Sequence, residues 1–217
     1  MFLNLLDFFL IIYFRQPILN IKMKIILATH NKDKEKELQS SLGEINIEIC
    51  SLFDFPEIGD IEETGTTLLE NSLLKSRTVF KETGIPAIAD DTGLEVDFLN
   101  GAPGVYSARY AGNNVSYQDN VNKLLIELNG VPFEKRTARF RTVITYVDKN
   151  EELSTEGHID GIISESMIGG DGFGYDPIFF VPDIGKTFAQ LSSVEKNKIS
   201  HRGIALKKLR KILINVL

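Results

Sequence analysis

The chain has 217 residues, with 24 lysines and arginines against 30 aspartates and glutamates, which gives a formal net charge of −6. Its hydrophobic fraction of 43% and charged fraction of 25% are those of an ordinary globular protein and exclude disordered and low-complexity architectures. The acidic balance disfavours binding to the phosphate backbone, so we expect no nucleic-acid partner. The single cysteine, Cys50, can form no internal disulfide, and we expect a reduced, buried core thiol in a cytoplasmic protein.

Residues 1–22 differ in character from the rest of the chain. The segment is strongly apolar at its start, but Asn4 and Asp7 interrupt it, and the uninterrupted part, residues 8–14, is far shorter than the ~20 residues of a membrane span. No positive charge precedes the apolar part, which argues against a signal peptide. We expect a dispensable N-terminal extension with no membrane partner, followed by one domain over residues 23–217.

Strand-like and helix-like apolar patterns alternate along the remaining chain. This alternation predicts a mixed α/β fold in two lobes with a cleft between them. The later half is rich in β-branched and aromatic residues, and its two long strands are expected to pair antiparallel. The expected strands lie at about 25–29, 45–49, 86–93, 137–148, 152–164 and 177–181, and the expected helices at about 32–42, 67–83, 116–129 and from 203, with Ser200 as N-cap.

The first group of polar residues lies where the first strand passes into the first helix. Backbone N–H groups at a helix N-terminus and the helix dipole favour an anion there, and Lys34 adds a positive charge. No G-x-x-x-x-G-K-[ST] motif occurs in the chain, so this segment is not a P-loop. The alternative is an N-cap at Asn31 followed by a solvated charged helix. The candidate anion-binding residues are Thr29, His30, Asn31, Lys32, Asp33 and Lys34.

Carboxylates form the second group. Asp90 and Asp91 lie at the carboxyl end of an apolar strand, at the edge where α/β sheets usually bind ligands, and adjacent strand residues point opposite ways. Glu62 and Glu63 precede the second helix, which carries Lys75. The two aspartates and one of the two glutamates could supply the few carboxylates that Mg²⁺ takes together with water and substrate phosphates. The alternatives are a solvated loop for the glutamates and an Asx turn for the aspartates.

A glycine-rich loop and the basic residues that follow it form the third group. Glycines within residues 169–174 let the backbone approach a flat ligand, while Phe173 offers a stacking face. Lys196 and Arg202 can donate to carbonyl or phosphate oxygens. A strand-like segment follows the loop, so it does not match the G-x-G-x-x-G pattern, and as a lone glycine loop it is a weak signal.

Seven stretches of the chain together carry a family resemblance: Thr29-x-Asn31-x-x-Lys34, Glu62-Glu63-Thr64-Gly65, Glu70-Asn71 with Lys75, Ala89 to Leu94, Gly101 to Tyr110, Phe173 to Phe179 and Ser200-His201-Arg202. From Met23 to its C-terminus the chain resembles the HAM1-type inosine/xanthosine triphosphate pyrophosphatase family. The resemblance implies a homodimeric, Mg²⁺-dependent enzyme with an elongated mixed sheet and flanking helices in two lobes around a central cleft. Such an enzyme hydrolyses deaminated purine nucleoside triphosphates, dITP, ITP and XTP, to monophosphate and pyrophosphate, which cleanses the nucleotide pool.

The resemblance also implies roles for individual residues. It makes Asp91 the proton acceptor and a metal ligand, with Glu62 as the second metal ligand. Thr29 to Lys34 and Thr92 would hold the triphosphate. Supporting positions fall to Glu63, Lys75 and Asp90, and the base and nucleotide pocket to Phe173, Gly174, Tyr175, Asp176, Lys196, His201 and Arg202.

Two departures from the family pattern are the N-terminal extension and Asp33, which stands where many members have a small residue, often glycine, and would repel phosphate. A Maf-like nucleotide pyrophosphatase of other specificity is one alternative, although Ser200-His201-Arg202 and the Phe173 to Asp176 turn favour the inosine-type interpretation. A sensor that binds purine triphosphates without cleaving them is another, against which the acidic cluster weighs. Asp91 is a poor base at the ordinary pKa of about 3.9, so proton removal requires a metal-acidified water or a raised pKa.

Overall fold

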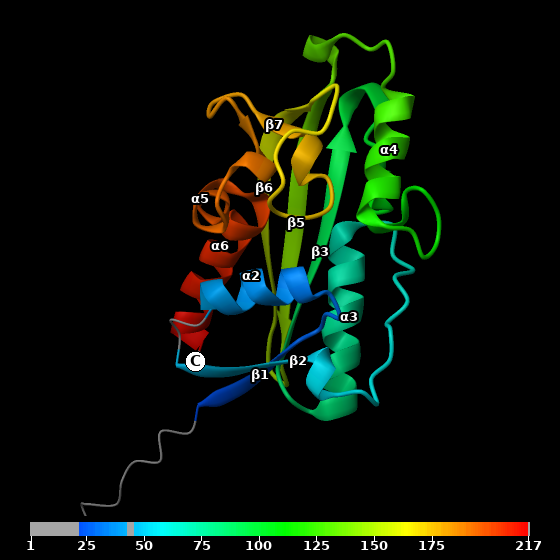
Figure 1. Ribbon diagram of the computed structural model, residues 1–217. Coiled ribbons are helices and arrows are strands. Elements are labelled where there is room, and N and C mark those ends of the chain that lie inside the picture. The colour runs from blue at the N-terminus through cyan, green and yellow to red at the C-terminus, as the bar shows by residue number, and fades with distance from the viewer. Residues whose placement is uncertain (1–21, 43–45, 217) are drawn as a thin grey trace, which may run out of the picture.

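The computed structural model describes residues 22–42 and 46–216, and the predicted extension lies outside them except for Lys22. Within that part of the chain, eight strands form one mixed sheet in the order β2-β1-β3-β5-β6-β7-β8, with β4 paired to β3 (Figure 1). None of the described helices is long and apolar enough to cross a membrane. The strands are β1 (Met23–Leu27), β2 (Ile47–Ser51), β3 (Ala87–Val96), β4 (Pro103–Gly104), β5 (Thr137–Val147), β6 (Glu152–Ile163), β7 (Phe179–Val181) and β8 (Lys186–Thr187). The α-helices are α2 (Lys32–Leu42), α3 (Leu68–Thr83), α4 (Tyr117–Glu127), α5 (Ser193–Ile199) and α6 (His201–Val216).

The predicted α/β class is confirmed, and the long strands β3, β5 and β6 give the molecule its elongated shape (Figure 1). β1 pairs in parallel with both β2 and β3, whereas β3, β5 and β6 pair antiparallel. The antiparallel pairing predicted for the two long later strands is confirmed, from Thr137 opposite Ile162 to Val147 opposite Glu152. The sheet is therefore parallel at one end and antiparallel over the rest.

Helices cover both faces of the sheet at its parallel end. Ile25 and Leu27 of β1 pack on one face in a cluster with α2 and α6, while Ile26 packs on the other face with Val79 of α3. Alternate strand residues face opposite sides, so a strand covered on both faces requires a continuous apolar run. Cys50 of the outermost strand β2 packs against the cluster that contains Ile26, but it is only partly buried, less than the predicted buried core thiol.

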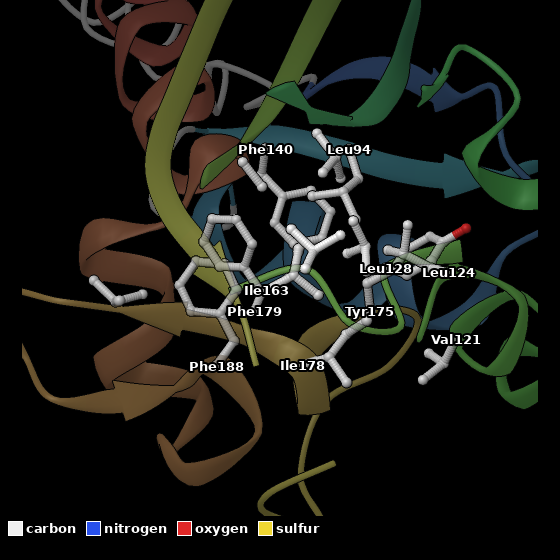
Figure 2. Close-up of a cluster of buried hydrophobic side chains, with 14 of the residues drawn as sticks. Leu94, Val121, Leu124, Leu128, Phe140, Ile163, Tyr175, Ile178, Phe179 and Phe188 are labelled. Atoms are coloured by element: carbon white, nitrogen blue, oxygen red, sulfur yellow. The ribbon is translucent and has the colours of Figure 1, made fainter. Parts of the chain in front are cut away.

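A second lobe is built around α4 and the far ends of β3 and β5 (Figure 2). Leu124 of α4 and Leu94 of β3 share one buried cluster with Phe140 of β5 and Phe179 of β7. The rings of Phe140 and Phe179 lie 4.6 Å apart between centroids. Residues of β3 and β5 belong to the buried clusters of both lobes, so these two strands connect the lobes.

The strand predicted to end within residues 90–93 continues to Val96. β3 runs over ten residues, and each of them pairs with one of β5, from Ala87 opposite Val147 to Val96 opposite Ala138. Asp, Thr and Gly are common turn formers, which made an end of the strand a reasonable expectation. The prediction is wrong because the antiparallel ladder to β5 extends along all of β3, well beyond Ala87 and Ile88, the two residues that also pair with β1. The two aspartates therefore lie within the sheet.

Most helices lie where the apolar spacing predicts them. The helices predicted at 32–42, 67–83 and 116–129 are confirmed to within two residues, and Thr67 and Ser116 are the N-caps of α3 and α4. Each N-cap oxygen accepts a hydrogen bond from the backbone N–H three residues later, which satisfies one of the donors exposed at a helix start.

The chain before the last helix contains one helix more than expected. Ser200 accepts a hydrogen bond from the Gly203 backbone N–H at 3.1 Å, as an N-cap should, but α6 begins earlier than predicted, at His201. Ser200 also ends helix α5, which was not predicted. The available signal was the capping box formed by Ser192 and Glu195.

Candidate active site

A cleft between the lobes consists of two adjoining hollows. We call them the aromatic hollow and the turn hollow. The aromatic hollow lies among β3, the glycine-rich loop before β7 and the start of α6, and the turn hollow lies against the β1–α2 turn. The two are continuous, because five residues line both: Asn31, Lys34, Glu63, Ala108 and Tyr117.

The turn hollow is lined by all six residues predicted to bind an anion, Thr29 to Lys34. Asn31 Oδ1 accepts hydrogen bonds from the backbone N–H groups of Asp33 at 2.9 Å and Lys34 at 3.1 Å. Asn31 is therefore the N-cap of α2, as the alternative interpretation held, and the same capped turn faces the cleft. Lys34 Nζ lies 3.2 Å from Asp90 Oδ2, so in this arrangement its charge is directed into the protein.

Asp90 and Asp91 point to opposite faces of β3, as their adjacency predicts. Asp90 is 2% exposed, and its Oδ2 accepts from Arg202 Nη2 and pairs with Lys34, both at 3.2 Å. Burial opposes ionisation there, but Lys34 and Arg202 outweigh it and hold the pKa of Asp90 well below its usual range. Asp90 thus serves as a buried anion behind the cleft and does not line either hollow.

Asp91 lines the aromatic hollow beside the turn hollow. Its Oδ2 accepts from Asn71 Nδ2 at 3.2 Å, and its Oδ1 accepts from the Thr92 backbone N–H at 3.0 Å. Burial raises the pKa of Asp91, with a smaller rise from the neighbouring Glu63, although Lys75 counteracts both. The site therefore shifts this carboxyl group toward the basicity that a proton acceptor needs.

The structure brings Glu63, and not the predicted Glu62, beside Asp91. Glu63 lines both hollows, and its carboxylate contacts Lys75 Nζ at 2.6 Å and Arg109 Nη1 at 3.0 Å. Glu62 is exposed and lines neither hollow, because successive residues of this extended segment point to opposite sides. Lys75 Nζ also lies 3.8 Å from Asp91 Oδ1, so the ammonium stands between the two carboxylates.

The carboxylates present suit Mg²⁺ only in one of its binding modes. No group of three or more His, Cys, Asp or Glu side chains within residues 22–42 and 46–216 is arranged to hold a metal ion. Mg²⁺ in phosphate-transfer sites usually takes one or two carboxylates and completes its shell with water and phosphate oxygens. Asp91 together with either Glu62 or Glu63 fits that mode, and a closed all-protein cage does not.

A buried ion pair shapes the wall of the aromatic hollow. Lys196 Nζ lies 2.7 Å from Asp176 Oδ2 and 3.1 Å from Glu37 Oε1, and it sits 4.7 Å from the centroid of the Phe173 ring. Asp176 Oδ2 also accepts from the Phe173 backbone N–H at 2.9 Å. The loop needs glycine here, since Gly172 has φ +77° and a Cβ would lie 2.1 Å from Asp176 Oδ2.

His201 and Arg202 enter the aromatic hollow from the first turn of α6. The His201 ring stacks on Phe140 with centroids 4.5 Å apart, and within the described structure its buried Nδ1 has no hydrogen-bond partner. Burial, together with Arg202 and Lys196, lowers the pKa of His201 well below its usual value, so the ring is neutral at pH 7. Arg202 pairs with Asp90 and with Glu37, so two carboxylates fix its guanidinium.

Most of the predicted site residues converge on the cleft, and a few important neighbours were not foreseen. Apart from Glu62 and Asp90, every predicted site residue lines one hollow or both. Glu37, in the charged helix that the alternative interpretation took as solvated, gave no sequence signal. Asn71 and Arg109 lie inside stretches that carried the family resemblance, which was a usable signal. The remaining unpredicted lining residues are Val105, Ser107, Ala108, Tyr117, Asn120 and Phe140 of the aromatic hollow and Ala28, Leu52, Asp60 and Ile61 of the turn hollow.

Comparison with known proteins places this site in a family. The sequence model of the Ham1 family matches residues 25–212. A dITP/XTP pyrophosphatase of Listeria monocytogenes is 51% identical over 196 residues, which cover 89% of this chain and 96% of that protein. A dITP/XTP pyrophosphatase of Photobacterium profundum is 48% identical over 189 residues, which cover 86% of this chain and 95% of that protein.

Solved structures agree with the sequence comparison. The Ham1 protein of Staphylococcus aureus has a TM-score of 0.81 at 39% identity and covers 89% of this chain and 100% of its own. A HAM1 protein from Coxiella burnetii has a TM-score of 0.82 at 41% identity, covering 89% of this chain and 99% of its own. The fold, the order of the site residues and these matches lead to one conclusion: the chain belongs to the Ham1 family.

Proposed function

We propose that the protein hydrolyses the deaminated purine nucleoside triphosphates dITP, ITP and XTP to nucleoside monophosphate and pyrophosphate. The observation that carries the proposal is the position of Asp91 and Glu63 at the junction of the aromatic hollow and the turn hollow. A nucleotide spanning the two hollows would place its phosphates beside these carboxylates. The names of the relatives from Listeria monocytogenes and Photobacterium profundum support the substrate class.

The aromatic hollow suits a purine base. Phe173 provides a ring face on which the base can stack. Lys196 and Arg202 can donate hydrogen bonds to the 6-oxo group of hypoxanthine or xanthine. The 6-amino group of adenine would leave those donors unpaired in a buried place, which is costly. Guanine shares the 6-oxo group, so its rejection must come from its 2-amino group meeting a wall or no acceptor.

The turn hollow suits the triphosphate. The start of α2 places the positive end of its dipole at this hollow, and Lys32, Lys34 and Lys75 line the same hollow. Thr92 adds a hydroxyl at the junction, where it donates to Asp90 or exchanges a hydrogen bond with Thr142. Asp33 lines this hollow as well, so it is placed to weaken phosphate affinity by repulsion.

For the chemistry we propose Asp91 as proton acceptor and metal ligand. Its raised pKa supports the first role, since a carboxylate at the ordinary value of about 3.9 would be a weak base. Bound Mg²⁺ would neutralise phosphate oxygens and acidify a water molecule. Lys34 and Lys75 would stabilise the charge that develops on the leaving pyrophosphate. The attacking water would be directed at the α-phosphorus.

The identity of the second metal ligand is an experimental question that the chain itself can answer. Glu62 is the ligand implied by the family resemblance, whereas Glu63 is nearer to Asp91 but already held by Lys75 and Arg109. Comparing Glu62→Gln with Glu63→Gln at a series of Mg²⁺ concentrations separates the two. The ligand is the residue whose loss raises the Mg²⁺ concentration needed for half-maximal rate.

A kinetic assay with several nucleotides tests the proposed substrate class. A panel of nucleotides should show a kcat/KM for ITP, dITP and XTP about 10⁴-fold above that for ATP, with little dependence on the 2′-hydroxyl. Equal kcat/KM for ATP and ITP would refute the substrate class. Nucleotide binding without hydrolysis of any nucleotide in the panel would instead indicate a nucleotide sensor.

The bond that is cut follows from isotope labelling. Hydrolysis in ¹⁸O-labelled water should place the label in the monophosphate, because water attacks the α-phosphorus. Label found only in pyrophosphate would mean attack at the β-phosphorus, and release of orthophosphate would mean cleavage of the terminal phosphate.

We also propose that the protein is a cytoplasmic homodimer. Light scattering of the purified protein tests the dimer directly.

A further inference from the structure

Tyr117 occupies the boundary between the two hollows and lines both of them. It is the first residue of α4, directly after the N-cap Ser116. Ser116 and Asp119 exchange capping hydrogen bonds, with the Asp119 N–H to Ser116 Oγ distance at 3.2 Å and the Ser116 N–H to Asp119 Oδ2 distance at 2.8 Å. These capping hydrogen bonds stabilise the first turn of α4, and they therefore fix the backbone position of Tyr117.

The hydroxyl of Tyr117 crosses the cleft to the β1–α2 turn. It accepts a hydrogen bond from Asn31 Nδ2 at 3.0 Å, although the two residues are 86 positions apart in the sequence. The other side-chain atom of Asn31, Oδ1, is the N-cap acceptor of α2. The amide group of Asn31 thus shapes the turn with one end and binds the opposite lobe with the other.

The ring of Tyr117 reaches the wall of the aromatic hollow. Its centroid lies 5.8 Å from that of Phe173, with the ring planes at 39°. Phe173 in turn carries Lys196 over its face, at 4.7 Å from the centroid. The next residue, Gln118, extends the same link by donating to Met167 Sδ at 3.1 Å. One side chain therefore contacts the turn that lines one hollow and the loop that lines the other.

We propose that Tyr117 is a positioning residue that acts as a latch between the two lobes. It holds them together at the boundary between the two hollows, where the sugar of a bound nucleotide would lie. This rests on the proposed function only for the identity of the ligand. Its hydroxyl is already engaged by Asn31, so it acts by holding the two hollows at one separation and not by binding the sugar itself. A nucleotide that must fill both hollows at once gains from that fixed separation.

The latch predicts a defined kinetic signature for Tyr117→Phe, which loses the hydroxyl and keeps the ring. Loss of one hydrogen bond at a partly exposed position should raise KM about three- to tenfold with kcat within twofold of the wild type. ITP and dITP should be affected equally. Inosine and pyrophosphate, each used alone as an inhibitor, should lose less affinity than the intact triphosphate, because neither fragment spans the cleft.

The matched control is Tyr106→Phe. Tyr106 is 57% exposed and lines neither hollow, so its variant should keep the wild-type KM and kcat. A second measurement needs no activity at all. Hydrogen exchange of the ligand-free full chain should be faster in Tyr117→Phe than in the wild type at the first turns of α2 and α4, and unchanged in Tyr106→Phe.

Each contrary result overturns the latch in a recognisable way. An unchanged KM together with unchanged exchange means that the hydroxyl holds nothing. A fall in kcat at constant KM means that Tyr117 acts on the chemical step. A loss confined to ITP means direct contact with the 2′-hydroxyl, and a loss equal to that of one fragment means a role in one hollow only. If the wild type releases no pyrophosphate from ITP, the proposed function fails, while the exchange experiment still decides the latch.

Discussion

In the aromatic hollow the charged groups are buried and paired within the protein, whereas the turn hollow also contains charged groups that face solvent. Lys196 is 5% exposed, Asp176 and Arg202 are 3% exposed, and each has an oppositely charged partner within 3.2 Å. In the turn hollow, Lys32 is exposed, and the contact of His30 Nδ1 with Asp60 involves an aspartate side chain that is 97% exposed. Buried counterions therefore stabilise the charged side chains of the aromatic hollow, whereas water stabilises the exposed ones of the turn hollow.

This difference assigns different tasks to the two hollows. A buried donor with an internal counterion is preorganised, so a base would find its hydrogen-bonding partners already in position. Exposed cations are screened by water and salt and contribute mainly when a polyanion arrives. We therefore expect substitutions in the aromatic hollow to change both stability and specificity, and those at exposed residues of the turn hollow to change affinity alone. Four experiments test this.

The largest effect is expected at the junction, for Asp91→Asn. Loss of the proton acceptor should lower kcat by about 10²- to 10⁴-fold, with a further loss from weakened metal binding. The far-ultraviolet circular dichroism and the cooperative unfolding transition should persist, because Asn keeps the shape of the side chain. Steady-state kinetics on ITP and thermal unfolding measure both. A near-normal kcat would remove Asp91 from the proposed chemistry.

The next effect concerns the stability that the buried pair controls. Asp176→Ala leaves Lys196 buried with only Glu37 beside it, and the free energy of unfolding should fall by about 3–5 kcal/mol. Adding Lys196→Met should restore part of that loss, since the uncompensated charge disappears. The control is Asp160→Ala, which breaks an exposed pair with Arg139 and should cost less than about 1 kcal/mol. Equal losses in urea unfolding would contradict the contrast.

A third experiment uses pH. The pKa of His201 is lowered in the folded state, so below about pH 6.5 the unfolded chain takes up a proton that the folded chain refuses. The free energy of unfolding should therefore fall as pH drops from 7 to 5, with this residue contributing up to about 1.4 kcal/mol per pH unit. His201→Gln should flatten that slope, and the exposed control His158→Gln should not. Identical slopes in both variants would mean that His201 is not held neutral.

The smallest effect is expected in the turn hollow. Lys32→Ala should raise KM for ITP by about two- to fivefold at low salt and by less at high salt, because an exposed charge is screened. Its free energy of unfolding should match the wild type. Lys36→Ala, an exposed lysine of α2 that lines neither hollow, should leave KM unchanged at any salt concentration. A salt-independent rise in KM for Lys32→Ala would show that its contact is not simply electrostatic.

Much of this protein could be predicted because it depends on neighbours in the sequence. The apolar run of β1 predicts a strand covered on both faces, and the caps Thr67 and Ser116 predict where α3 and α4 begin. The short motifs were enough to identify the family and nearly all residues of the cleft. Hydrophobic period, capping and motif order are local properties, and local properties can be read from the chain alone.

The tertiary structure decided what depends on direction and on distant partners. β3 continues through Asp90 because β5 pairs with it and because Lys34 and Arg202 neutralise its buried charge. Glu63 reaches the cleft and Glu62 does not, although the sequence treats them alike. Glu37 contacts Lys196 across 159 positions of sequence, and no local pattern records such a pair. Which way a side chain points, and which charge it meets there, is fixed only when the lobes pack together.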